Sequence, residues 1–164
     1  MKKHAYFSIL LVCLFSASLF AGDAVDFSGT WTLDESKVED TGGGPNMAAG
    51  KIVVKQDDKT FSSDRFLSNE MMGDFTVTVN VTLNGEETKS EEQFGTRVST
   101  ATWSEDKKSL TINSTMFMSF DGQDMEMKSV EVWSIEKKNV IKLETTFEGP
   151  MGTMESTNYY NKAE

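Results

Sequence analysis

Apolar and polar side chains alternate along most of the chain after residue 50. The clearest stretch is DFTVTVNVTL, residues 74–83, where Thr or Asn separates the apolar positions. Those apolar positions are Phe75, Val77, Val79, Val81 and Leu83. A period of two places them on one face of an extended strand and the polar residues on the other. No segment shows a sustained 3.6-residue apolar repeat, so the pattern predicts half-buried antiparallel strands.

Ten segments of this kind follow one another, with turn signals between them. We predict strands at residues 27–33, 51–57, 60–67, 75–83, 86–93, 96–103, 109–119, 124–135, 139–147 and 153–161. Most connections are too short for a crossover, which favours antiparallel neighbours. A long meander loses its open edges most simply by closing on itself. The sequence therefore predicts an all-β fold, an antiparallel up-and-down meander closed into a barrel of about 8–10 strands.

One short phrase occurs twice along the chain. TATWSEDKKSLTI starts at residue 100 and VEVWSIEKKNVIKL at residue 130, so that Trp103 and Trp133 occupy equivalent positions. Two strands with their turns fill this offset, which places both turns at the same end of the barrel. We expect Trp103 and Trp133 to plug that end.

The loops of the two ends differ in composition. One end, here called the base, has short charged loops at residues 57–60, 84–87, 104–108 and 135–139. The other end, here called the mouth, has loops rich in Gly, Met and Phe at residues 42–47, 68–74, 94–96, 119–123 and 148–154. Ligand sites in barrels lie inside the open end, so we expect a site at the mouth.

Methionines concentrate near the mouth. A two-residue turn at Asp121-Gly122 would pair Met118 with Met125 and Met116 with Met127 on one face. Further methionines fall on mouth loops, namely Met71, Met72, Met151 and Met154. Flexible, polarizable Met side chains accommodate varied apolar ligands, which makes this set a candidate ligand-binding surface. Gap-filling core residues and a Cu(I) site built from thioethers are the alternatives.

The N-terminus predicts a secretory leader. Lys2 and Lys3 precede an apolar run at residues 6–20, and Ala21 offers a small residue for cleavage. We expect residues 1–21 to be a signal peptide and residues 22–164 to be one secreted or periplasmic domain. A single membrane anchor and a lipid-modified Cys13 are the alternatives.

The acidic composition disfavours two classes of partner. Loss of the leader would leave 14 of the 16 basic residues against 26 acidic ones, a net charge of about −12. Such a surface repels nucleic-acid phosphates and anionic lipid headgroups. We expect neither nucleic-acid binding nor membrane association after leader removal.

Catalytic chemistry has few candidate residues. Cys13 and His4 are the only residues of their types, and both belong to the leader. The mature chain would then hold no Ser-His or Cys-His nucleophile and no common zinc or haem ligand. We expect no catalytic residues, no metal and no cofactor. An isomerase that works by cavity shape with a lone Glu or Tyr is an open alternative.

The two arginines of the chain are candidates for contact with a polar ligand group. Arg65 shares strand parity with Phe61 and Leu67, which predicts an inward side chain, and Arg97 follows the FGT turn at the mouth. An inward guanidinium would neutralise an acidic headgroup. Surface or strand-spanning salt bridges are the alternative for both. Asn84-Gly85 has the sequence of a tight hairpin turn. Pairing of the two strands on either side of it would place Glu92 on the same face as Val77, Val79 and Val81, which is inward if that face lines the interior.

A motif near the start of the predicted domain resembles a known superfamily. DFSGTWTLDESK, residues 26–37, is similar to the G-x-W opening of the calycins, which include the lipocalins and the fatty-acid-binding proteins. The matching residues are Phe27, Gly29, Trp31 and Leu33. The later W-S-x-D-x-K-x-L-x-I rhythm resembles small secreted bacterial lipocalin-like domains.

The resemblance implies both structural and functional roles. It implies that Trp31 packs across the barrel base with Lys162 over it. It also implies that late-strand residues hold a ligand, for which Tyr159 is a candidate, although no late-strand Arg accompanies it. The expected function is extracytoplasmic carriage of a small apolar or amphipathic molecule. The alternative is a protein-interaction module, an inhibitor or envelope scaffold, whose mouth loops grip a protein partner.

Overall fold

The computed structural model of the protein describes residues 23–38, 48–69, 73–92, 95–120, 123–150 and 152–163. The predicted leader and three of the candidate site residues, Met71, Met72 and Met151, lie outside these ranges. No helix within these ranges is long and apolar enough to cross a membrane.

Ten strands and one short 3₁₀ helix make up this part of the chain. The strands are β1 (Gly29–Leu33), β2 (Lys51–Gln56), β3 (Thr60–Asn69), β4 (Gly73–Thr82), β5 (Thr88–Glu92), β6 (Gly95–Trp103), β7 (Ser109–Phe120), β8 (Gln123–Lys137), β9 (Val140–Gly149) and β10 (Gly152–Lys162), and the helix is η1 (Glu35–Lys37). Each strand end lies within two residues of the end predicted from the alternation. The predicted all-β, up-and-down fold is confirmed.

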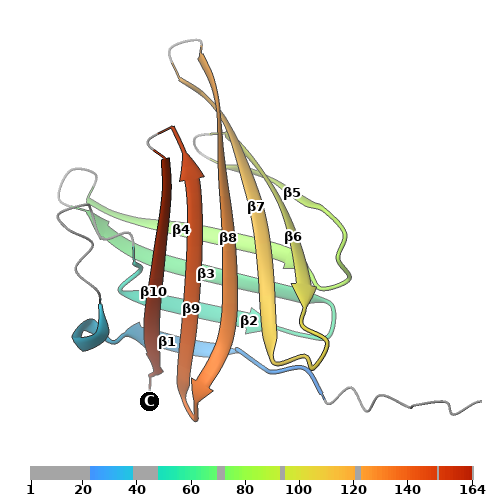
Figure 1. Cartoon of the computed structure of the whole chain (residues 1–164), viewed down its shortest axis with the longest axis vertical. Coiled ribbons are helices and arrows are strands. Elements are labelled where there is room, and N and C mark those ends of the chain that lie inside the picture. Colours follow the sequence, from blue (N-terminus) through green and yellow to red (C-terminus); the bar gives the residue numbers. More distant parts are fainter. Residues whose placement is uncertain are drawn as a thin grey trace, which may run out of the picture.

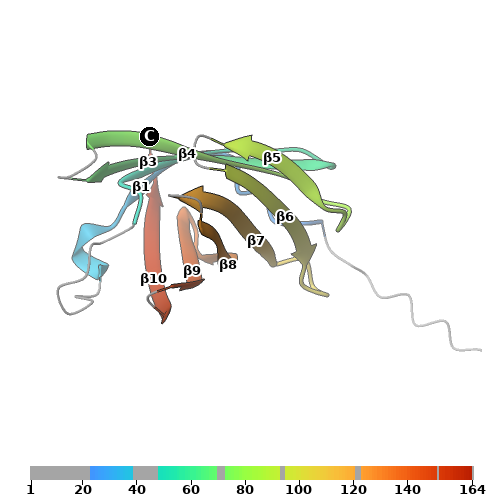
Figure 2. The same cartoon turned by 90° about the horizontal axis from the view of Figure 1, so that it is seen from above.

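The strands form one antiparallel sheet in the order β4-β3-β2-β1-β10-β9-β8-β7-β6-β5. β1 pairs with both β2 and β10, which joins the first four strands to the last six. Figure 1 shows β2, β3 and β4 crossing behind β6 to β10, and Figure 2 shows these groups as two layers curving toward each other. The edge strands β4 and β5 approach each other, so the barrel is nearly closed.

The barrel opens where the sequence predicts a hairpin. Asn84-Gly85 links β4 to β5, but these strands lie at opposite ends of the sheet order, so the expected hydrogen-bonded hairpin was wrong. The Asn84 side-chain oxygen accepts a hydrogen bond from the Glu86 N–H at 3.0 Å, and β5 starts only at Thr88. This side-chain turn lengthens the connection beyond the two residues that a tight hairpin needs.

Aromatic rings fill the base of the barrel. Phe27 is fully buried and stacks on Trp103, with ring centroids 6.1 Å apart and an interplanar angle of 6°. Trp133 is also fully buried and meets Phe61 edge-to-face at 5.2 Å. Trp103 and Trp133 therefore lie at the base as expected, with Phe27 between them. Apolar burial and ring geometry both stabilise this cluster.

The arrangement expected for Trp31 is also present. Trp31 is buried, and its indole N–H donates a hydrogen bond to the Phe27 carbonyl oxygen at 2.8 Å. The Lys162 Nζ lies 5.2 Å from the centroid of the Trp31 ring, close enough for a cation–π contact. Gly29 has φ +138°, and a side chain there would place its Cβ 2.9 Å from the Lys162 Cε.

Candidate ligand-binding site

The inner face of the barrel changes from buried to partly exposed along its long strands. In β4, Val81 and Val79 lie near the base and are each 2% exposed. Val77 and Phe75 continue the same face toward the mouth and are only half-buried. Because all four side chains point the same way, the change reflects how well the interior is filled at each level.

The opposite wall shows the same change. In β8, Trp133 at the base is fully buried, whereas Met127 on the same face is half-buried. In β10, Tyr160 is buried, whereas Met154 near the mouth is 47% exposed. The described side chains thus fill the base half of the barrel and leave those of the mouth half accessible to solvent. We call the latter the open half.

The predicted pairing of the methionines is confirmed. Met116 lies opposite Met127, and Met118 lies opposite Met125, in the β7–β8 ladder. All four are half-buried. Met116 and Met118 share strand parity with the buried residues Leu110 and Ile112 of β7, and Met125 and Met127 share it with the buried Trp133 of β8. They therefore stand on the inner face of the open half.

A buried ion pair lies beneath the open half. Arg65 on β3 donates two hydrogen bonds to the Glu131 carboxylate on β8, each with an N···O distance of 2.5 Å. The Trp133 indole N–H donates a third to the same carboxylate at 3.2 Å. Glu131 is 6% exposed, and the Arg65 guanidinium carbon lies 5.4 Å from the Trp133 ring centroid. Arg65 is therefore inward, as predicted, and already paired.

The pair is ionised despite its burial. Burial by itself would raise the pKa of the Glu131 carboxyl, but the Arg65 charge and the hydrogen bonds from Arg65 and Trp133 outweigh it, so this pKa is lowered. Burial likewise opposes the charge on Arg65, and Glu131 outweighs it, so the Arg65 pKa is raised. A carboxylate held by three donors and a guanidinium with a bidentate partner form a stable unit.

Arg97 at the mouth is paired in the same way. Its Nε and Nη2 atoms both donate to the Glu92 carboxylate, the second at 3.0 Å. In the ladders, Arg97 lies opposite Ser90 on one side and Met116 on the other. Both arginines thus face the interior, as predicted. Both also form salt bridges, which was the alternative expectation.

Sequence reasoning did not single out the acidic partner on β8. Glu131 shares strand parity with Trp133 and Met127, so the alternation itself placed it on the inner face. Its contact with Arg65 joins residues 66 positions apart, which no local pattern reveals.

Small hydroxyl residues line the boundary between the filled half and the open half. They occupy the inner face of β6 to β10, one on each strand, and we call them the hydroxyl belt: Ser99, Ser114, Ser129, Thr145 and Ser156. Ser99 lies opposite Ser114, Ser114 opposite Ser129, and Thr145 opposite Ser156. The Ser99 and Ser114 hydroxyls bond to each other at 2.7 Å. Ser129 and Thr145 are half-buried and Ser156 is exposed, so these three residues are accessible to solvent.

The two adjacent tyrosines of β10 lie on opposite faces. Tyr160 is 1% exposed, and the charges of Arg65 and Glu131 act on it inside the barrel. Tyr159, the candidate predicted to hold a ligand, lies opposite Lys142, and the Lys37 Nζ is 4.7 Å from its ring centroid. Alternation along the strand turns Tyr159 outward, so the interior tyrosine is Tyr160.

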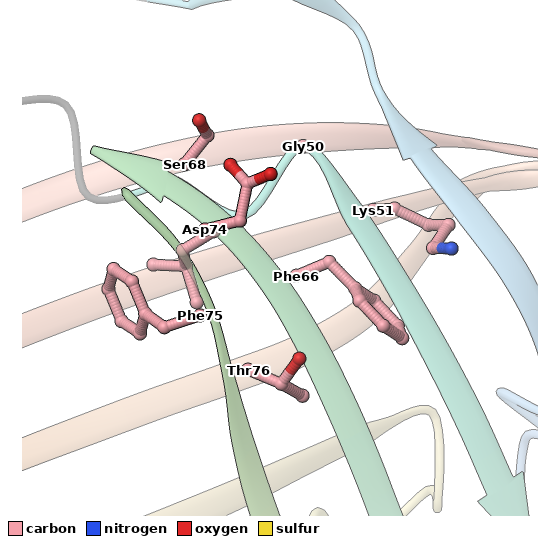
Figure 3. Close-up of a pocket in the computed structure, with 8 residues that line it drawn as sticks. Gly50, Lys51, Phe66, Ser68, Asp74, Phe75 and Thr76 are labelled. Atoms are coloured by element: carbon pink, nitrogen blue, oxygen red, sulfur yellow. The ribbon is translucent and has the colours of Figure 1, made fainter. Parts of the chain in front are cut away.

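Two surface hollows lie at the two ends of the barrel, and neither is lined by the methionines of the open half. One, of about 400 Å³, is lined by residues at the mouth ends of β2, β3 and β4. Figure 3 shows Phe66 and Phe75 there, projecting from neighbouring strands to different sides. Phe66 lies opposite Thr76, so Phe75 belongs to the other face of the sheet. The hollow therefore combines a rim of outward polar groups with the edge of the apolar interior.

The second hollow, of about 670 Å³, lies at the base. Its walls include Trp103, Lys107 and four aspartates, namely Asp23, Asp26, Asp57 and Asp58. No group of three or more His, Cys, Asp or Glu side chains in the described ranges is arranged to hold a metal ion. This hollow is acidic surface with no arrangement of ligating groups.

Comparison with known proteins gives no family assignment. No protein-family model, curated protein or solved structure matches the chain. The site is therefore defined by its own geometry, a Met-lined open half above a hydroxyl belt and a buried ion pair.

Proposed function

We propose that this protein binds and carries a small apolar or amphipathic molecule in the open half of its barrel. The observation that carries the proposal is the change in burial along the inner face. Side chains at the base are buried, whereas inner side chains of β4, β7, β8 and β10 near the mouth are half-buried or exposed. Proteins normally pack their interiors densely, so an inner apolar surface left accessible is a binding-site signature.

The side chains of the open half set the character of the ligand. Met116, Met127, Met118 and Met125 form a continuous patch of thioether side chains on two paired strands. Phe147 lies opposite Met154 and extends the apolar surface to β9 and β10. Flexible Met side chains adapt to ligands of different shape, which favours carriage of an apolar body over recognition of one rigid molecule.

We propose further that the protein acts outside the cytoplasm as a lipocalin-like calycin barrel. The leader pattern of residues 1–21 supports export. The contact between Trp31 and Lys162, the close approach at Gly29 and the ten-strand meander support the calycin relationship.

Uptake of a neutral fluorescent probe, N-phenyl-1-naphthylamine, tests the proposal. The variant Met116→Lys/Met127→Glu places a charged pair on the inner face, where the two positions lie opposite each other. Its control is Phe117→Lys, which creates the same kind of pair on the outer face because Phe117 lies opposite Glu126. We expect the wild type and Phe117→Lys to enhance probe fluorescence, and the inner variant to lose this enhancement.

Two results would contradict the proposal. Uptake that is equal in the inner and outer variants would place the site elsewhere. Absence of uptake by the folded wild-type protein would favour the alternative of a protein-interaction module, for which capture of a protein partner by the mouth loops is the next test.

A further inference from the structure

We infer that the ligand is uncharged and that its polar end carries a hydroxyl or carbonyl oxygen in place of a carboxylate. This inference rests on the proposed function and specifies its ligand class. It follows from the charges that face the interior and from the hydroxyl belt.

The charges on the inner face are balanced above the base. Lys162 takes an inward position at the base end of β10, over the Trp31 ring. Among the described strands above that level, the charged residues at inward positions are Arg65, Arg97, Glu92 and Glu131. Each guanidinium binds one carboxylate through two nitrogen atoms. Neither arginine therefore has an unsatisfied positive charge for a ligand to neutralise.

A carboxylate ligand would disturb this balance. To gain an arginine it would have to displace Glu131 or Glu92, and each of these has a side chain that is at most 22% exposed. The displaced glutamate would remain in a poorly hydrated interior without a cation. Removing one partner from a buried ion pair is strongly unfavourable, because the other charge is left uncompensated. The same reasoning disfavours a cationic ligand, which would compete for the glutamates.

The hydroxyl belt offers uncharged partners at the right depth. Ser129 lies one inner position below Met127 on β8, opposite Phe147, and Thr145 lies one inner position below Phe147 on the neighbouring strand β9. A hydroxyl group both donates and accepts hydrogen bonds, so it serves an alcohol or a ketone equally well. An apolar body among the methionines would bring its oxygen to this belt.

A matched pair of probes separates the two ligand classes. Decan-1-ol and decanoate have the same chain length and differ in the polar end, which is neutral in one and ionised at neutral pH in the other. Each is titrated against the purified chain loaded with N-phenyl-1-naphthylamine. We expect decan-1-ol to displace the probe at a concentration at least about tenfold lower than decanoate. Equal or stronger displacement by decanoate would overturn the inference and leave the proposed function intact.

Two variants test the cause of the preference. Ser129→Ala/Thr145→Val removes two belt hydroxyls with little change in shape, and it should weaken the binding of decan-1-ol more than the binding of the fluorescent probe. Glu92→Gln leaves Arg97 without its anion, so it should strengthen the binding of decanoate and not that of decan-1-ol. Glu92 is near the mouth and less buried than Glu131, so this variant tests charge balance at a smaller risk to folding.

The remaining outcomes are also decisive. Unchanged affinities in both variants would overturn the inference. Failure of both decyl compounds to displace a bound fluorescent probe would overturn it as well. Failure of the wild-type chain to bind the fluorescent probe at all would contradict the proposed function itself.

Discussion

Arg65 and Glu131 connect the two walls of the barrel through two N···O contacts of 2.5 Å, although 66 residues separate them in the chain. Arg65 belongs to β3 and Glu131 to β8, strands that lie five positions apart in the sheet order. Sheet hydrogen bonds link only neighbours, so this pair ties together strands that the ladder does not connect directly.

Removal of one partner of this pair should destabilise the barrel strongly. We expect Glu131→Gln to lower the free energy of unfolding by about 3 kcal/mol, because Arg65 remains buried without its anion. Replacement of both residues, as Arg65→Met/Glu131→Leu, should restore most of the loss. Urea denaturation of the three proteins measures both effects. The exposed pair Lys89–Glu91 provides the control, since Glu91→Gln should leave the transition unchanged. A Glu131→Gln midpoint equal to that of wild type would refute a stabilising role for the pair.

The same carboxylate should make stability depend on acid pH. The Glu131 pKa is lowered in the folded chain from its ordinary value of 4.5, so the unfolded chain binds a proton first as the pH falls. The contribution of Glu131 is therefore present above about pH 4.5 and is lost as the pH falls through the folded-state pKa. Urea midpoints measured across this range should show the difference between wild type and Glu131→Gln shrinking at low pH. A difference that stays constant would show that Glu131 is not ionised in the fold.

Tyr160 should make stability fall as the pH rises through the alkaline range, the opposite direction to the effect of Glu131. Burial raises its pKa from 10.0 to about 12. Between these values the unfolded chain loses the phenolic proton while the folded chain keeps it, so stability falls as the pH rises. We expect wild type to lose about 2 kcal/mol relative to Tyr160→Phe across this interval, since the variant has no proton to lose. Parallel stability curves for the two proteins would contradict the buried, neutral Tyr160.

Gly29 should tolerate substitution poorly. Its φ of +138° is strained for any residue with a side chain, and the new Cβ would lie 2.9 Å from the Lys162 Cε. We expect Gly29→Ala to destabilise the barrel by about 1–3 kcal/mol. Gly50→Ala is the matched control, because nothing lies within 4 Å of a Cβ there. The urea midpoints of the two variants measure the effect, and equal midpoints would refute it.

Local pattern was sufficient to predict the strands and several of the residues that share the inner face. A period of two defines both the extent of a strand and the face of each residue, so all ten strands followed from the alternation. The pairing of Met116 with Met127 followed from a two-residue turn, because a short loop leaves little freedom of register. Arg65 was placed inward by its parity with Phe61.

Features that depend on distant strands were not predictable from local pattern. The Asn84-Gly85 turn has the sequence of a tight hairpin, but here it spans the opening between the two edges of the sheet. Two adjacent aromatic residues left the parity of β10 ambiguous, and tertiary packing turned Tyr160 inward in place of Tyr159. The ion-pair partner of Arg65 lies across the barrel, so the two residues meet only when the sheet curls into the barrel.

Native mass spectrometry would reveal directly whether the open half holds a small molecule. The wild-type protein and the Met116→Lys/Met127→Glu variant would be purified from the native host, and each native mass would be compared with its denatured mass. We expect a small-molecule adduct on the wild type that is lost on denaturation and is absent from the variant. A wild-type protein with no adduct, even after incubation with N-phenyl-1-naphthylamine, would contradict this expectation.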